Sequence, residues 1–121
     1  MRAQAHRRKA ERISRSLAKI GPDDHEIMID GALLAISHWL NYALHRAGLT
    51  AIHDDVVHAY FVTAFDRQHF GLVIGPDYLD ALDEIDTFRP LYVRGNVSGG
   101  GDAARRARTL QKRIERKALG G

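Results

Sequence analysis

Three segments of the chain repeat apolar residues three and four positions apart, which is the period of an amphipathic helix, and glycine, proline and cap residues divide the chain into five helical candidates. The first segment shows this most simply, because Ala10, Ile13 and Leu17 fall on one face of a helix. The last segment carries a similar stripe from Ala103 to Ala118. The stripes and their breaks predict helices over residues 3–20, 23–48, 50 to 65 or 69, 76 to 89 or 94, and 102–119.

Cap residues mark three of the helix starts. Asp23 followed three residues later by Glu26 resembles a capping box, in which both side chains accept hydrogen bonds from free backbone N–H groups. Thr50 and Asp102 are typical N-cap residues and predict the starts of the third and fifth helices.

Glycine and proline mark the connections. We expect residues 70–76 to form a packed loop and the glycine-rich residues 96–101 to form a flexible linker. Pro76 suits the start of the fourth helix, and Pro90 should distort its last turn.

These elements predict an all-α fold, a four- to five-helix antiparallel bundle. A length of 121 residues suits one domain over residues 1–121. Within it, a basic N-terminal helix over residues 1–20 precedes a bundle over residues 24–119.

The second predicted helix is apolar on two sides. One face is an ordinary core stripe from Ile29 to Ala47, and a second face lies roughly opposite. Such a helix either lies at the centre of its own bundle or forms half of a subunit interface. We favour a homodimer, with these interface residues: Ile27, Leu34, His38, Trp39, Tyr42 and His45.

Charge is segregated along the chain, although the net charge is only +3. Residues 1–20 and residues 103–121 each hold seven basic residues against one acidic residue, whereas residues 21–102 hold four basic and thirteen acidic residues. Basic ends of this kind either contact nucleic acid or another anionic surface, or lie against the acidic middle and neutralise it.

The composition limits the cellular location that we expect and the chemistry that the side chains can support. The absence of cysteine excludes disulfides and thiolate ligands, and it suits a reducing compartment. The longest apolar run, residues 32–36, is far shorter than the ~20 residues of a membrane helix. The basic N-terminus leads into no apolar signal segment. We therefore expect a cytoplasmic chain without a membrane span.

Seven histidines invite a metal hypothesis, but their spacing gives it little support. His38 and His45 lie two turns apart, too far to share one metal unless other helices contribute. No Glu-x-x-His pair, nucleophile elbow or phosphate-binding loop is present. The sequence therefore predicts no metal, no cofactor and no intrinsic catalysis.

One group of polar residues is a better candidate for binding. Arg89, Tyr92, Arg94 and Asn96 follow one another at the end of the fourth predicted helix. Arginine can form paired hydrogen bonds to carboxylate or phosphate, and tyrosine can stack on a ring. These residues either hold a ligand or partner, or cap the helix and fill the core.

Residues 29–45, Gly48 and residues 53–61 together resemble the small helical HEPN family. The likeness covers about residues 24–119. It implies a dimeric helical bundle that acts either as a metal-independent ribonuclease or as a noncatalytic partner of a nucleotidyltransferase.

The ribonuclease motif of that family is an arginine followed, after four to six residues, by a histidine near the last helices. Arg94 has the right position, but no histidine follows His69. Arg46 and His53 have the right spacing in the wrong place. The leading hypothesis is therefore a noncatalytic HEPN-like dimer that binds a partner or a nucleotide. The alternatives are a ribonuclease that uses Arg46 and His53, and a nucleic-acid-binding protein with basic ends.

Overall fold

The computed structural model describes residues 1–120 and contains five α-helices in this range. They are α1 (Ala3–Leu17), α2 (His25–Arg46), α3 (Ala64–Ile74), α4 (Asp77–Phe88) and α5 (Gly100–Ala118). A 3-10 turn, η1 (Ala59–Phe61), precedes α3, and a π-helical turn, η2 (Arg89–Val93), follows α4. No strand occurs within residues 1–120, so the all-α helical bundle is confirmed.

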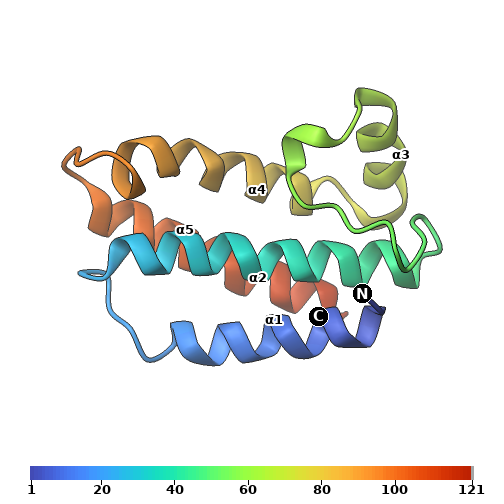
Figure 1. Cartoon of the computed structure of the whole chain (residues 1–121), viewed down its shortest axis with the longest axis horizontal. Helices are drawn as coiled ribbons and strands as arrows, with labels where there is room; N and C mark the ends of the chain where they lie inside the picture. Colours follow the sequence, from blue (N-terminus) through green and yellow to red (C-terminus); the bar gives the residue numbers. More distant parts are fainter. Residues whose placement is uncertain (121) are drawn as a thin grey trace.

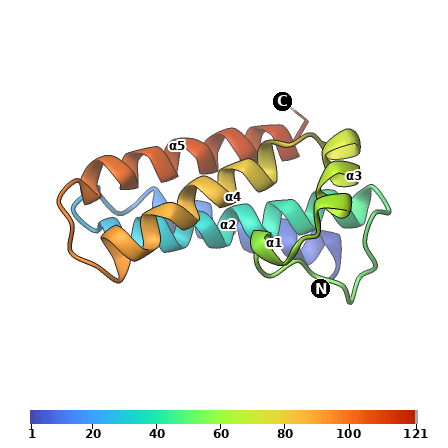
Figure 2. The same cartoon turned by 90° about the horizontal axis from the view of Figure 1, so that it is seen from above.

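Four helices form a trunk, which we define as α1, α2, α4 and α5. Helix α2 runs through its middle, and α1 and α4 lie antiparallel to it on opposite sides (Figure 1). Helix α5 runs parallel to α2 and antiparallel to α4 (Figure 2). Residues 49–63, here called the crossing segment, leave the end of α2 and lead to α3 at one end of the trunk.

The position of α2 explains its two apolar faces. Helix α2 packs on α1, α4 and α5 at once, and Ile29, Ile36, Leu40 and Leu44 have no exposed surface. Leu17 of α1 approaches α2 at Gly31, where a Cβ atom would lie 2.6 Å from the Leu17 Cδ2 atom. A larger residue at Gly31 would therefore force the Leu17 side chain to move where these two helices meet.

Two predicted caps are wrong. Asp24, not Asp23, is the residue before α2, and no side chain caps this helix, since Glu26 lies beside His25 instead. Gly99 precedes α5 with a φ of 103°, a left-handed conformation that favours glycine. Asp102 therefore lies inside the first turn of α5, and the predicted linker 96–101 ends within that helix.

The third helix starts later than predicted. Residues 50–58 are not helical, and Thr63 is the true N-cap, because its Oγ1 accepts a hydrogen bond from the Asp66 N–H at 3.1 Å. Helix α3 then extends through much of residues 70–76, where a loop was predicted. Polar contacts to α1 and α2, described below, hold residues 50–58 in an extended path instead.

The fourth helix agrees with its prediction. Helix α4 begins at Asp77 after Pro76, and the helix widens to the π-helical turn η2 at Pro90. Helix α2 is the one helix within residues 1–120 that is long and apolar enough to cross a membrane, but 56% of its most apolar window is buried in the fold. A core helix shows the same combination, so the absence of a membrane span stays a prediction.

Candidate functional site

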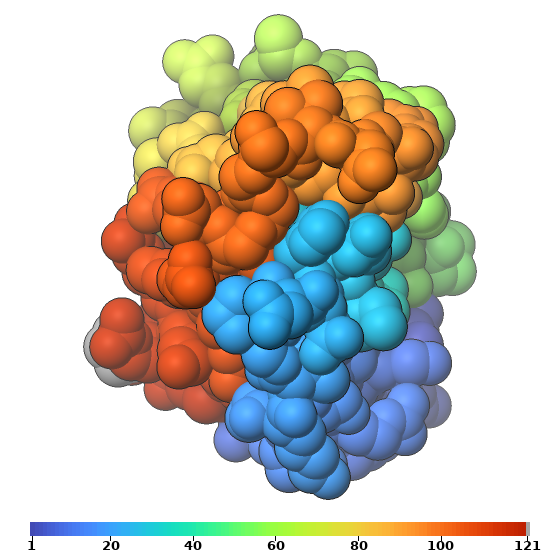
Figure 3. Space-filling model, turned by 90° about the vertical axis from the view of Figure 1, so that its left-hand side faces the viewer, coloured from blue at the N-terminus to red at the C-terminus, as the bar shows by residue number. Residues whose placement is uncertain are grey.

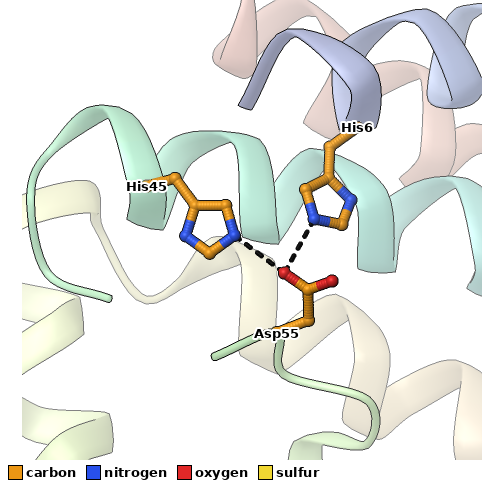
Figure 4. Close-up of side chains that lie close together, drawn as sticks. All are labelled: His6, His45 and Asp55. Atoms are coloured by element: carbon orange, nitrogen blue, oxygen red, sulfur yellow. Dashed lines mark hydrogen bonds and ion pairs between the residues drawn. The ribbon is translucent and has the colours of Figure 1, made fainter. Parts of the chain in front are cut away.

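Four polar side chains from three separate segments meet beside the crossing segment. His6 comes from α1, His38 and His45 come from α2, and Asp55 comes from the crossing segment. The Asp55 Oδ1 atom lies 2.9 Å from His6 Nε2 and 2.8 Å from His45 Nε2, as Figure 4 shows. His6 Nδ1 lies 2.8 Å from His38 Nδ1. We call these four residues the histidine cluster.

Helix spacing and one asparagine assemble this cluster. His38 and His45 are seven residues apart, so they lie on one face of α2, and the antiparallel α1 places His6 between them. Asn41 lies on the same stretch of α2. Its Nδ2 donates to the Val56 carbonyl at 2.9 Å, and its Oδ1 accepts from the Val56 N–H at 2.7 Å. This pair of bonds positions the neighbouring Asp55.

The protonation pattern follows from which atoms can accept. A carboxylate only accepts, so both His6 Nε2 and His45 Nε2 donate to Asp55. In a neutral His6 the other ring nitrogen, Nδ1, then accepts from His38 Nδ1–H. The His38 Nε2 atom keeps its lone pair and bonds to no other described residue.

Burial supports the same assignment. Burial lowers the pKa of His6, although the Asp55 carboxylate opposes the shift. Burial, helped by the neighbouring His6, also lowers the pKa of His38 to about 4. Partial burial acts to raise the pKa of Asp55, but the hydrogen bonds from both histidines outweigh it and lower this pKa to about 2. At neutral pH the cluster therefore holds an ionised Asp55 beside neutral His6 and His38.

A pocket of about 410 Å³ opens beside the cluster. One wall is apolar and includes Leu33, Leu34, Val57 and Leu82. The remaining lining is polar and comes from the cluster, from α2, from α4 and from the crossing segment: His6, Asp30, Ser37, His38, Asn41, Asp55, His58, Asp86 and Arg89. A pocket of this size and mixed lining suits a small organic ligand.

The charged residues of the pocket largely pair with one another. Arg89 Nε lies 3.0 Å from Asp30 Oδ1, and its Nη1 lies 3.9 Å from Asp86 Oδ1. Burial raises the pKa of Asp86, with Arg89 acting in the opposite direction. With Asp55 included, three carboxylates face one guanidinium, so the pocket carries an acidic balance.

The structure does not gather the four residues of the predicted binding group. Arg89 lines the pocket, whereas Tyr92 packs half-buried near Phe88. Arg94 and Asn96 are exposed, and their side chains form no hydrogen bond or ion pair within residues 1–120. Only Arg89 therefore belongs to the candidate site.

The six predicted interface residues also separate. Trp39 and Tyr42 are buried in the core of the chain itself, so they cannot form an exposed interface. His38 and His45 belong to the histidine cluster. The exposed apolar residues of this set are Ile27 and Leu34, which are 64% and 49% exposed.

The predicted nuclease pair is not assembled either. Arg46 Nη1 donates to the Tyr42 hydroxyl at 2.6 Å, and His53 is an exposed side chain whose charged neighbour is Asp54. Within residues 1–120, no hydrogen bond or ion pair joins Arg46 to His53. Neither residue lines the pocket beside the histidine cluster.

Sequence reasoning missed His6 and Asp55. Neither has a motif spacing to another cluster member, because they lie 32 and 17 residues from His38 along the chain. The sequence offered one signal, which was that a metal at His38 and His45 would need a ligand from another helix. In the structure, His6 of α1 and Asp55 join His45, but not His38, in a group that could hold a metal ion.

The chain matches no family model, and comparisons with curated proteins and with solved structures gave no significant match.

Proposed function

We propose that this protein is a noncatalytic helical binding module and that its pocket holds a small organic amine with an apolar body. The observation that carries the proposal is a pocket lined both by an apolar wall and by His38, whose Nε2 atom bonds to no other described residue. An ammonium group can donate to His38 Nε2 while the rest of the ligand covers Leu33 and Val57.

The charge of the pocket supports a cationic ligand over an anionic one. Asp86 is desolvated in the pocket, and a desolvated carboxylate is stabilised by a cation in contact with it. The positive charge of Arg89 is already offset by Asp30 at 3.0 Å and Asp86 at 3.9 Å, so it attracts a phosphate less strongly than an unpaired arginine would. An amine therefore fits this lining better than the nucleotide that the sequence suggested.

The same groups support binding over catalysis. A base whose pKa is about 4 takes up a proton weakly at neutral pH, which leaves the His38 Nε2 lone pair available as an acceptor and makes His38 a poor general base. The two ring nitrogens of His6 are already engaged, by Asp55 and His38.

Two probes with the same apolar body and opposite charge test this proposal. In EDTA, phenethylamine should shift the NMR signals of His38 and Val57 saturably, and phenylacetate should not. Asp86→Asn should weaken phenethylamine binding at least about tenfold, the scale of a lost charge-assisted hydrogen bond. Asp23→Asn, a change of the same charge far from the pocket, should leave binding unchanged.

The proposal fails if phenylacetate binds as tightly as phenethylamine, or if Asp23→Asn weakens binding as much as Asp86→Asn. Either result would mean that the acidic balance of the pocket does not select the ligand.

Nucleic-acid binding is a second candidate, favoured by the placement of the two basic ends. Ser14 of α1 donates to Glu115 of α5 at 3.1 Å and accepts from Gln111 at 3.2 Å, so these helices lie side by side. A groove of about 500 Å³ between them is lined in part by Arg105, Arg108 and Lys112. Figure 3 shows the start of α5 beside the α1–α2 connection at this end of the molecule.

Few of these basic residues pair with the acidic middle of the chain. Arg106 pairs with Glu84 and Lys117 with Asp77, whereas several others form no ion pair within residues 1–120: Arg8, Lys9, Arg12, Arg15, Lys112, Arg113 and Arg116. If they contact phosphates, affinity for single-stranded RNA should fall with salt by about 0.7 logarithmic units per contact. Replacing Lys112 and Arg113 with glutamine should then reduce this slope by about 1.4.

We also propose a homodimer, as the HEPN-like resemblance implies, with a nucleotidyltransferase-type protein as its partner. Exposed apolar residues support the dimer. They are Ile27 and Leu34 on α2 and, more extensively, Phe65, Leu72 and Val73 on α3. The α3 stripe is the larger surface, so we assign the interface to it.

A further inference from the structure

We infer that His6, His45 and Asp55 bind a divalent transition-metal ion such as Zn²⁺, a function that the proposed amine binding does not include. One ligand atom from each residue, His6 Nε2, His45 Nε2 and an Asp55 oxygen, lies within 4.8 Å of the other two. The ligands come from α1, α2 and the crossing segment, so folding is what brings them together.

The donor set indicates the class of metal. Two imidazole nitrogens and one carboxylate oxygen are ligands that Zn²⁺ and Fe²⁺ use in protein sites with open coordination positions. Ca²⁺ and Mg²⁺ prefer sets made only of oxygen ligands. The structure therefore favours a first-row transition metal over an alkaline-earth ion.

Both imidazoles already have the outer partners that a metal-binding histidine needs. His6 Nδ1 lies 2.8 Å from His38 Nδ1, and His45 Nδ1 lies 2.8 Å from the Thr50 hydroxyl oxygen. Such partners fix the ring orientation so that the other nitrogen points at the metal. An isolated surface histidine lacks this support, which separates the pair from the exposed His53.

The distances between the ligand atoms and the exposed position of Asp55 also fit a metal site. Tetrahedral ligands at 2.0–2.1 Å from zinc lie about 3.3 Å apart, whereas Asp55 Oδ1 now lies 2.8–2.9 Å from the two nitrogens. A metal thus requires the distance from Asp55 Oδ1 to each nitrogen to lengthen by about half an ångström. Asp55 can make this shift, because its side chain is 31% exposed on a non-helical segment, while both histidines are fixed on helices.

The protons can be redistributed without being lost. Metal binding requires the lone pair of each Nε2 atom, so the proton of His45 moves to Nδ1 and is donated to Thr50. The proton of His6 moves to its own Nδ1 and is donated to His38, whose proton moves from Nδ1 to Nε2. The number of protons on each of the three rings is the same before and after metal binding.

Nearby positive charge opposes the metal but leaves its ligand atom available. The Met1 ammonium lies 3.3 Å from Asp55 Oδ2, on the carboxylate oxygen that does not bond to the histidines. Lys9 and Arg12 lie close enough to affect His38. The ionised Asp55 carboxylate is the group that offsets this repulsion.

The test is a titration of the EDTA-treated full chain with Zn²⁺ by calorimetry and with Co²⁺ by visible absorption. We expect one ion per chain and an absorption band typical of Co²⁺ with nitrogen and oxygen ligands. His45→Gln and Asp55→Asn should each weaken binding at least about 100-fold, since even the loss of an outer partner costs ~10–100-fold. Thr50→Val removes the hydroxyl partner of His45 Nδ1 and leaves the Thr50 carbonyl oxygen at 3.3 Å, so it should weaken binding by up to about tenfold. His53→Gln, at the exposed histidine, should leave the affinity unchanged.

Nitrogen NMR of the histidine rings provides a readout independent of fold stability. In EDTA, His6 and His45 should carry their protons on Nε2, and in the Zn²⁺-loaded chain on Nδ1. Unchanged tautomers at saturating Zn²⁺ would overturn the inference. If His53→Gln weakened Zn²⁺ binding as much as His45→Gln, the inference would also be overturned, because the ion would then bind surface histidines adventitiously. Circular dichroism in EDTA identifies variants that fail to fold, and Thr50→Val then carries the test.

Discussion

The trunk and the crossing segment are held in place by different forces. Ile36 and Leu40 of the trunk are completely buried, and their helix α2 packs against α1, α4 and α5. The crossing segment instead exposes its largest apolar side chains, including Val57 and Phe61. Hydrogen bonds from α1 and α2 side chains fix its path.

This difference separates global from local stability. Burial of apolar surface is shared by all helices of the trunk, so losing part of it lowers the free energy of unfolding of the whole chain. Polar anchors act at single points, so losing one opens the crossing segment and leaves the trunk folded. The histidine cluster lies at the boundary, since its histidines belong to the trunk and Asp55 belongs to the crossing segment.

The largest effect should come from a cavity in the trunk. Ile36→Ala removes a buried side chain of α2 and should lower the free energy of unfolding by about 2–5 kcal/mol. The matched change Val57→Ala, on an exposed apolar residue, should cost less than about 0.5 kcal/mol. Urea denaturation measures both. Equal costs would mean that the crossing segment packs as tightly as the trunk.

The next effect should be a dependence on alkaline pH that comes from the trunk. Burial raises the pKa of Tyr78 on α4 to about 12, from 10.0. Because the folded pKa is the higher one, the stabilisation is complete below pH 10 and is lost as the pH rises toward 12. Over this range the chain should lose about 2–3 kcal/mol more than Tyr78→Phe, which keeps the ring and removes the ionising group. Urea denaturation at a series of pH values measures the free energy of unfolding of both proteins. If the two free energies fell in parallel as the pH rose, water would already reach the Tyr78 hydroxyl in the folded chain.

A smaller effect is expected at the polar anchor of the crossing segment. Asn41→Ala removes both bonds to Val56, and we expect a cost of about 1–2 kcal/mol, because the freed backbone groups lie close enough to the surface to be hydrated. Amide hydrogen exchange at Val56 should accelerate while that of Leu40 stays slow. Asn96→Ala, at an exposed position, should change neither rate. Faster exchange at Leu40 would contradict a purely local role for Asn41.

The same contrast explains what the sequence could and could not predict. The α1 and α5 stripes are regular, and each faces the core as a single stripe, so the period alone located these helices. Thr50 has the chemistry of an N-cap, but its hydroxyl bonds to His45, five residues earlier on α2. A side-chain bond back to the preceding helix therefore takes the place of a cap on the next one.

The candidate site was harder to predict for a related reason. Helical spacing places His38 and His45 on one face of α2, and Arg89 was identified from its chemistry. The contribution of His6 depends on how α1 lies along α2, and that of Asp55 depends on Asn41. Both are consequences of the packed fold, and neither leaves a pattern along the chain.

The smallest effect on stability should come from the exposed stripe of α3, where the effect on association should be large. Phe65 and Leu72 are 78% and 81% exposed, so replacing both with glutamine should change the free energy of unfolding of the monomer by less than about 0.5 kcal/mol. If the dimer forms through this stripe, the same change should shift the particle to a monomer in sedimentation and light scattering. Ile27→Gln with Leu34→Gln, the matched change on α2, should leave the dimer intact. A monomer produced by the α2 pair alone would place the interface on α2, where the sequence predicted it. A dimer that survives both pairs would exclude both surfaces.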